Sequence, residues 1–245
     1  MSDQSSFIPI DDLQAGLKLV RDACRAQTAA KIWVKDHGII SKTRLLAFDF
    51  NQDRFSVAIN EDLDIAALNE GISRDSSVYL NFETQGLSLF VKAEFIGLSI
   101  PAAKIELRLP SKIFRTQQRK HPRAVVRDRS DVQIVHADPV QPNRVLTRKL
   151  NDLSVGGASM ILFYGEERHY HVRQRLESIE LKIKDQVIHT WGIVRHLAVF
   201  PQDSEVQGIK LGIEFFNLGP TDQKIISDLV DSEIRHQFEG LQIES

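Results

Sequence analysis

The sequence predicts a mainly β protein composed of two small antiparallel β-barrels with flanking helices. Its 245 residues suit two domains of roughly 100–130 residues better than one. Apolar residues make up 42% of the chain and charged residues 26%, so each half can build a core of its own. In both halves, apolar and polar residues alternate in short runs that end at turn-forming residues, which is typical of barrel strands.

The first half begins with a predicted helix over residues 9–27, in which Leu13, Leu17, Val20 and Cys24 share one face. Cys24 is therefore expected to be a small core residue rather than a reactive thiol. Residues 61–72 are expected to form a second, short helix. The remaining pattern has a spacing of two and marks about six strands, at Ile32 and Val34; Ile39, Leu45 and Ala47; Phe55, Val57 and Ile59; Val78, Leu80 and Phe82; Leu87, Leu89 and Val91; and between Pro101 and Pro110.

The second half is also predicted to consist mainly of β-strands, and it ends in a helix. Thr221 is the expected N-cap of that helix, Asp222 lies in its first turn, and Ile225, Ile226, Leu229 and Val230 share a face. Five or six strands precede it, which predicts a second barrel. Their alternating residues are Val132, Ile134 and His136; Ala158, Met160 and Leu162; Ile179, Leu181 and Ile183; Trp191, Ile193 and Arg195; and Ile209, Leu211, Ile213 and Phe215.

The charge and composition exclude several classes of protein. A formal net charge of −2 and a pI near 6.5 do not fit a globally basic nucleic-acid coat. No apolar run reaches the length of a membrane-spanning helix, and the first residues lack the features of a secretory signal. A single cysteine excludes a disulfide framework and a cysteine-based zinc site, and it fits a reducing cytosol. We therefore expect a cytoplasmic protein.

Positive charge is concentrated in one segment. Residues 111–150 carry 10 Lys/Arg and 3 Asp/Glu, whereas the segments before and after them have net charges of −3 and −6. The part from Ser111 to Arg129 has few large apolar residues and contains Pro122, so neither a strand nor a helix is expected there. It is interpreted as a linker and loop between the domains. Its charge indicates either a solvated face or a site for an anion such as phosphate.

Two short motifs lie near this boundary. Arg119 and Arg123 form an R-x-x-x-R motif, and about thirty residues later Asp152, Ser154 and Gly157 form D-x-S-x-x-G. Alone, the first can arise by chance and the second can be a simple strand-ending turn. Together they suit a guanine nucleotide, because arginine binds phosphate oxygens or a guanine edge and a carboxylate accepts from the N1–H and N2–H₂ donors of guanine.

The pair of motifs resembles the signature of the PilZ domain, a bacterial receptor module for cyclic di-GMP (c-di-GMP). Residues 191–195 and 211–215 are similar to the G-x-V and G-I-x-F strands of that family. The first half resembles the N-terminal domain of YcgR-type flagellar brake proteins, both in the helix end at residues 19–22 and in residues 109–119, which run into the arginines. The resemblance implies an N-terminal YcgR-N-like split barrel over residues 1–110, an arginine-rich linker over 111–124 and a PilZ barrel with a C-terminal helix over 125–245.

The family's roles transfer to the matching positions only. Arg119 and Arg123 would clamp c-di-GMP, Asp152 would hold a guanine edge, and Ser154 with Gly157 would shape the base and phosphate contacts. Further ligand contacts are expected from Arg115, Gln118, Lys120 and Gly156. The chain departs from the family in having Gln118 where a further arginine is common and His121 with Pro122 where aromatic residues are common. These departures bear on affinity and on whether one or two nucleotides bind.

The resemblance also implies an output. Binding would fix the angle between the two domains, and the partners would be flagellar motor proteins, either stator or switch complex, at the basal body. No nucleic acid, membrane insertion, cofactor or metal is implied. The alternative is a PilZ-fold protein-interaction module in which nucleotide binding is weak or lost, for which Gln118 and Pro122 are the motivation.

Other chemistries find less support in the residues. His169 and His171, with Glu166 and Glu167 nearby, would share one face of a strand and could bind a metal, or they could mark an exposed strand edge. Ser154 is not a nucleophile elbow, because Asp152 stands where the first glycine of G-x-S-x-G belongs. Phosphate-loop and zinc-protease motifs do not occur in the sequence. A flavin-binding oxidoreductase remains an analogy of fold alone, so we expect no enzymatic activity.

Overall fold

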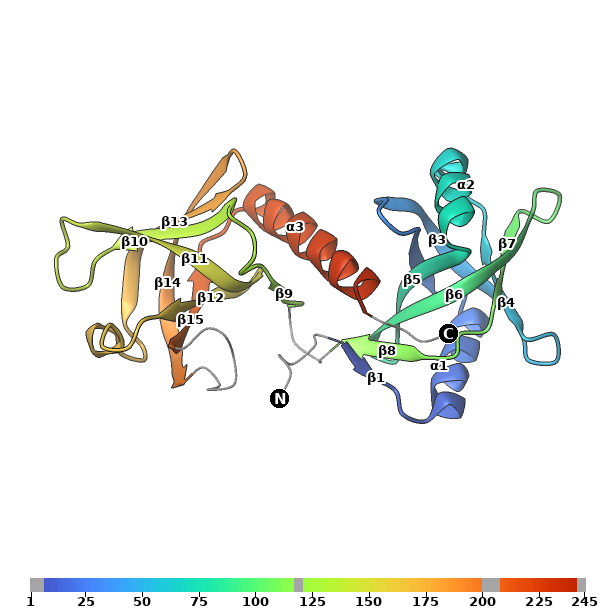
Figure 1. The fold of residues 1–245 in the computed structure, drawn as a ribbon, viewed down its shortest axis with the longest axis horizontal. Helices are drawn as coiled ribbons and strands as arrows, with labels where there is room; N and C mark the ends of the chain where they lie inside the picture. Colours follow the sequence, from blue (N-terminus) through green and yellow to red (C-terminus); the bar gives the residue numbers. More distant parts are fainter. Residues whose placement is uncertain (1–6, 117–120, 200–207, 242–245) are drawn as a thin grey trace. The chain divides into compact units, whose positions relative to one another are not determined.

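A computed structural model describes residues 7–116, 121–199 and 208–241 and divides into two compact units. The front unit contains the described residues up to 116 together with those from His236 onward. The other unit contains the described residues from 121 to Arg235. Each unit holds one closed, antiparallel six-stranded ring (Figure 1). The prediction of a mainly β protein with two small antiparallel barrels is confirmed.

The front barrel is closed by one long strand, β6, which pairs with β5 and also with β7. The order around the ring is β6-β5-β2-β3-β4-β7, and β6 pairs again with β7. Alternate apolar residues point inward, including the fully buried Leu80, Leu89 and Leu107. The ring strands are β2 (Ala29–Trp33), β3 (Ile39–Asp49), β4 (Arg54–Ala58), β5 (Ser77–Thr84), β6 (Leu87–Ser99) and β7 (Lys104–Arg108).

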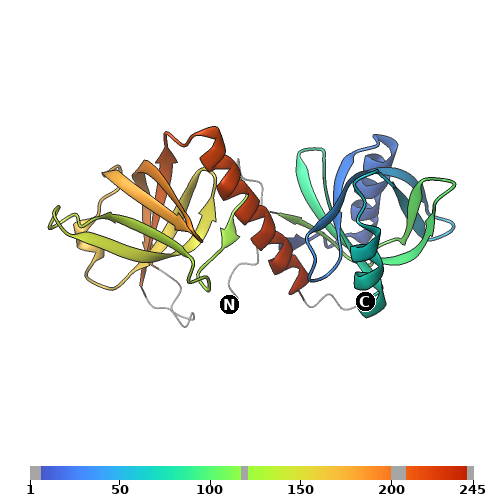
Figure 2. The same ribbon diagram turned by 90° about the horizontal axis from the view of Figure 1, so that it is seen from above.

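Two helices lie against this barrel (Figure 2). Helix α1 (Leu13–Arg25) begins where Asp12 accepts hydrogen bonds from the backbone N–H groups of the first turn, and α2 (Ile65–Arg74) begins in the same way at Asp64. The expected core position of Cys24 is confirmed, because its side chain is buried on the inner face of α1 and burial raises the pKa of its thiol to about 12.

The second barrel has the ring order β10-β13-β14-β15-β12-β11, closed by the pairing of β10 with β11. Leu181, Leu211 and Met160 are among its fully buried inner residues. The strand β9 (Ala124–Val125) is added at β11. The ring strands are β10 (Val132–Ala137), β11 (Val145–Ser154), β12 (Gly157–Leu162), β13 (Arg175–Ile183), β14 (Gln186–Val199) and β15 (Ile209–Phe216).

The described parts of the basic stretch from Ser111 to Arg129 contain two short strands. The expectation that it contains no strand is wrong, because β8 (Ile113–Thr116) pairs with β6 and with β1 (Phe7–Pro9), and β9 pairs with β11. Both strands are too short to leave a clear alternation in the sequence. Ile113 of β8 is nevertheless fully buried in the front core, and this packing holds β8 in place.

The long helix α3 (Pro220–Glu239) begins one residue before the expected N-cap, so Thr221 lies inside the helix. Asp222 acts from the first turn instead, and its carboxylate accepts a hydrogen bond from the backbone N–H of Gly219 at 3.3 Å. The last turn of α3 belongs to the front unit. There the ring of Phe238 is fully buried, with ring centroids 5.0–6.4 Å away in Phe7, Trp33, Tyr79, Phe90 and Phe114.

Candidate functional site

The site centres on Asp152, a buried carboxylate on β11 of the second barrel. Asp152 lies opposite Ser159 of β12, and Ser159 in turn lies opposite Gly212 of β15. A bulge between Leu150 and Asp152 interrupts the regular pairing of β11 with β12. Both polar side chains at the bulge, Asn151 and Asp152, are buried, with 8% and 6% of their surface exposed.

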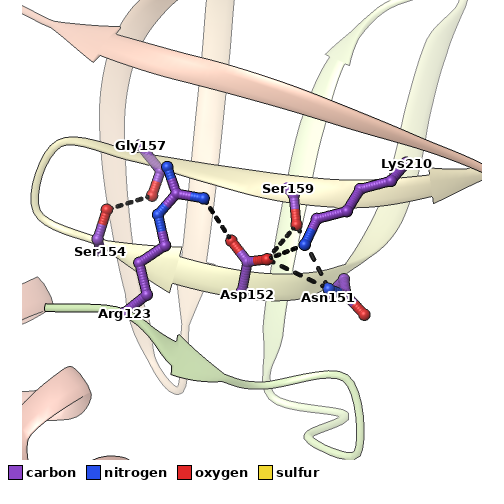
Figure 3. Close-up of polar contacts among 7 residues, drawn as sticks. All are labelled: Arg123, Asn151, Asp152, Ser154, Gly157, Ser159 and Lys210. Atoms are coloured by element: carbon purple, nitrogen blue, oxygen red, sulfur yellow. Dashed lines mark hydrogen bonds and ion pairs between the residues drawn. The ribbon is translucent and has the colours of Figure 1, made fainter. Parts of the chain in front are cut away.

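The two oxygens of the Asp152 carboxylate have very different surroundings (Figure 3). Oδ2 accepts from the Lys210 ammonium at 2.6 Å, the Ser159 hydroxyl at 2.6 Å and the Asn151 amide at 3.2 Å. Among the described residues, Oδ1 has one long contact, to Arg123 Nη1 at 3.5 Å. One oxygen is therefore crowded with donors, whereas the other is only loosely engaged.

These donors determine the protonation state of the Asp152 carboxyl. Burial by itself would raise the pKa of Asp152, but hydrogen bonds from Lys210 and Ser159 and the charges of Lys210 and Arg123 outweigh it. The pKa of this carboxyl therefore lies below its ordinary value, and Asp152 is ionised at neutral pH. The site presents a carboxylate between two cations, which suits a ligand that carries both hydrogen-bond donors and anionic groups.

Strand β9 positions Arg123. Val125 lies opposite Asp152 and Ala124 lies opposite Leu153, so the residue before β9 is held next to the carboxylate. The Arg123 side chain is 35% exposed and can turn toward solvent or toward a ligand. Arg123 of the first motif thus meets Asp152 of the second motif on the second barrel.

Ser154 and the glycines shape the turn between β11 and β12. The buried Ser154 hydroxyl donates to the carbonyl oxygen of Gly157 at 3.0 Å and closes the turn. Glycine is not needed here for a positive φ, because neither Gly156 nor Gly157 has one. Instead, a Cβ at Gly157 would collide with the backbone carbonyl oxygen of Ile213, and a Cβ at Gly156 would lie 2.8 Å from the His121 ring.

The remaining predicted contacts divide into three groups. Gly156 lies in the turn just described, next to Gly157. Arg119, Gln118 and Lys120 lie outside the described residues. Arg115 lies on β8 in the front unit, opposite Leu89 and Ile8. The described part of the chain therefore brings together five of the predicted residues, Arg123, Asp152, Ser154, Gly156 and Gly157.

Three residues of the site were missed from the sequence: Lys210, Ser159 and Asn151. A signal for Lys210 exists in β15, where Leu211, Ile213 and Phe215 point into the core and the alternate positions point outward. Lys210 is thus the outward-facing cation on the strand that follows β12 around the barrel. Ser159 could be identified in the same way, because its inward neighbours are Ala158 and Met160.

The histidine pair is not a metal site. The expectation of a strand with His169 and His171 on one face is wrong, since Glu167–His169 form a single 3-10 turn and His171 lies in the loop that follows. Glu166 is engaged by Arg148 at 2.6 Å. Within the described ranges, no group of three or more His, Cys, Asp or Glu residues is arranged to hold a metal ion. None of the described helices is long and apolar enough to cross a membrane.

No protein-family model matches the chain, and no curated protein matches it. Several solved structures do. YcgR from Escherichia coli with c-di-GMP is 17% identical, with 98% of this chain and 97% of YcgR covered and a TM-score of 0.41. The MrkH–c-di-GMP complex of K. pneumonia is 15% identical, with 96% and 100% covered and a TM-score of 0.43. The Bacillus subtilis inhibitor of motility MotI/DgrA is 16% identical, with 88% and 99% covered and a TM-score of 0.38.

Proposed function

We propose that the chain is a non-catalytic c-di-GMP receptor of the YcgR type. The observation that supports this most directly is the contact of Arg123 with Asp152 at 3.5 Å, because it joins two motifs that lie about thirty residues apart. A guanine nucleotide needs a hydrogen-bond acceptor for its N1–H and N2–H₂ groups and cations for its phosphates. Asp152 supplies the acceptor, and Arg123 and Lys210 supply cations within one cluster.

In the proposed complex, Arg123 exchanges partners. Its contact with Asp152 Oδ1 is long, and its side chain is partly exposed, so little is lost when the guanidinium turns to a phosphate or to the O6/N7 edge of guanine. Arg119 would clamp the ligand from the same loop, as the resemblance implies. The Ser154–Gly157 turn would present a flat surface to the base, because glycine has no Cβ to hold it away.

The proposed output is control of flagellar motility through contact with motor proteins. Ligand binding would fix the angle between the two units, as the resemblance implies. The names of the similar structures include an inhibitor of motility and a c-di-GMP-dependent transcription regulatory factor. The net charge of −2 favours a protein partner over DNA for this chain.

Calorimetric titration with c-di-GMP tests the receptor proposal, with GTP as the control ligand. Arg123→Ala should abolish saturable binding. Arg144→Ala should leave it intact, because the Arg144 side chain is 64% exposed and its contact with the Asp138 carboxylate is long, at 3.9 Å. Melting provides a second readout, since a ligand at one hundred times its Kd stabilises the folded protein by about 2.7 kcal/mol. Absence of both heat and a melting shift for the wild type would refute the proposal.

The second candidate is a protein-interaction module that has kept the fold and lost tight nucleotide binding. The saturation of Asp152 Oδ2 by three internal donors favours it, because a carboxylate that is already satisfied gains less from a guanine edge. Equal melting temperatures with and without c-di-GMP, together with capture of a specific motor protein by both the wild type and Arg123→Ala, would support this candidate instead.

A further inference from the structure

The crowding of Asp152 Oδ2 raises the question of which donor leaves when a ligand arrives. An ionised carboxylate has about four lone-pair positions, two on each oxygen. In the described part of the chain, Oδ2 already faces three donors, whereas Oδ1 faces one long contact. A guanine edge presents two parallel N–H donors, which pair best with both oxygens of one carboxylate. Such pairing requires a donor to leave Oδ2.

Two of the three donors cannot leave. Ser159 is fully buried and Asn151 is 8% exposed. Ser159 lies opposite Asp152 on β12, and Asn151 precedes Asp152 on β11. Their removal from Oδ2 would take away the acceptor of the buried Ser159 hydroxyl and leave the Asn151 amide with its longer contact to Ser159 Oγ at 3.4 Å, which is costly. The Lys210 side chain is 28% exposed, and its long flexible stem allows the ammonium to reach water without any change in the backbone. Lys210 is therefore the donor on Oδ2 that can be displaced.

We propose that Lys210 acts as an internal occupant of the guanine-binding position and sets the affinity of the site. In the unliganded protein its ammonium takes the place of a guanine N–H on Asp152 Oδ2. Binding then replaces the hydrogen bond from Lys210 to Asp152 with one from guanine to Asp152. The free energy needed to break the Lys210–Asp152 pair therefore makes the free energy of ligand binding less favourable. The inference rests on the proposed c-di-GMP function and adds a residue that the two sequence motifs do not contain.

The first test needs no ligand. Lys210→Met keeps most of the side-chain volume and removes the ammonium, and Lys182→Met is the matched control on the exposed face of β13. Carboxyl-carbon NMR should give an Asp152 pKa that is higher in Lys210→Met than in the wild type and unchanged in Lys182→Met, because Lys210 provides the strongest pairing for this carboxylate. An equal Asp152 pKa in Lys210→Met and wild type would mean that the internal pair does not form in solution and would overturn the inference.

The second test measures c-di-GMP binding by calorimetry. Lys210→Met should bind about tenfold more tightly than the wild type, since one charge-assisted hydrogen bond no longer has to be broken, whereas Lys182→Met should match the wild type. Asp152→Asn should remove this gain when combined with Lys210→Met, because an amide offers only one acceptor to the guanine edge. A cooperative melting transition for each variant shows that it is folded.

The outcomes separate the two proposals. If the wild type binds and Lys210→Met binds equally or more weakly, the inference fails while the receptor function stands. Weaker binding would make Lys210 a direct ligand contact, and equal binding would mean that it takes no part in binding. If neither protein binds at millimolar c-di-GMP, the receptor function fails, and the NMR titration alone decides whether the Lys210–Asp152 pair exists. Tighter binding by Lys210→Met, or binding by that variant alone, supports both proposals.

Discussion

Phe238 should contribute more to the stability of the front unit than any other residue of α3. It is fully buried, and five aromatic rings surround it. Phe→Ala replacements at buried sites cost about 3–5 kcal/mol, because the transfer free energy is lost and a cavity remains. The five surrounding rings all belong to hydrogen-bonded strands of one sheet, which limits their collapse into the space, so we expect a loss near the middle of this range, about 4 kcal/mol.

Urea denaturation followed by the fluorescence of Trp33 measures this loss, because Trp33 is fully buried and its ring centroid lies 6.4 Å from that of Phe238. A Trp191→Phe background removes the other tryptophan and keeps an aromatic ring stacked on Phe216. With an m-value of about 2 kcal/mol/M, the transition of Phe238→Ala should move down by about 2 M urea. Phe163→Ala is the matched control, since Phe163 is 69% exposed, and it should change stability by no more than about 0.5 kcal/mol. A loss below about 1 kcal/mol for Phe238→Ala would refute the packing of the α3 terminus in the front core.

Three further predictions concern the second barrel. Gly157→Ala should destabilise the protein by about 1–3 kcal/mol, seen as a lower melting temperature, because the added Cβ meets the backbone oxygen of Ile213; an unchanged melting temperature would contradict this close approach of the strands. Ser154→Ala should cost about 1 kcal/mol in urea denaturation, since it removes the buried hydrogen bond to Gly157; retained stability would mean that the turn closes without it. Because the folded pKa of Asp152 is depressed, this carboxylate stabilises the fold at pH values above its unfolded pKa, and that stabilisation is lost as the pH falls through the folded value. The difference in free energy of unfolding between wild type and Asp152→Asn should therefore be largest near neutral pH and shrink below about pH 4; a difference independent of pH would show that the charge of Asp152 is not what matters.

The strands with clear alternation could be predicted from the sequence because one side of each faces a barrel core. The runs at Val78, Leu80 and Phe82 and at Ile209, Leu211 and Ile213 lie in β5 and β15. The strand β8 could not be predicted, since its four residues include Arg115 and Thr116 and only Ile113 and Phe114 are buried. Its order comes from pairing with strands distant in sequence, which no local pattern records.

The candidate site was predictable to the extent that its residues occur in short motifs. Arg123 and Asp152 could be paired because each belongs to a motif with a chemical meaning. Lys210 lies about sixty residues from Asp152 in the sequence, and it reaches that carboxylate only because β15 follows β12 in the barrel. The correct order of strands around the ring is therefore needed before this residue can be assigned to the site.

The burial of Cys24 makes the chain well suited to site-specific labelling. It is the single cysteine of the sequence, and the thiolate that reacts with maleimides is suppressed by burial and by a pKa of about 12. A cysteine introduced at an exposed position of each unit, such as Phe50 or Phe163, should take up a dye while Cys24 stays unmodified. A pair of such dyes would report by energy transfer whether c-di-GMP changes the separation of the two barrels, with every native site residue left in place.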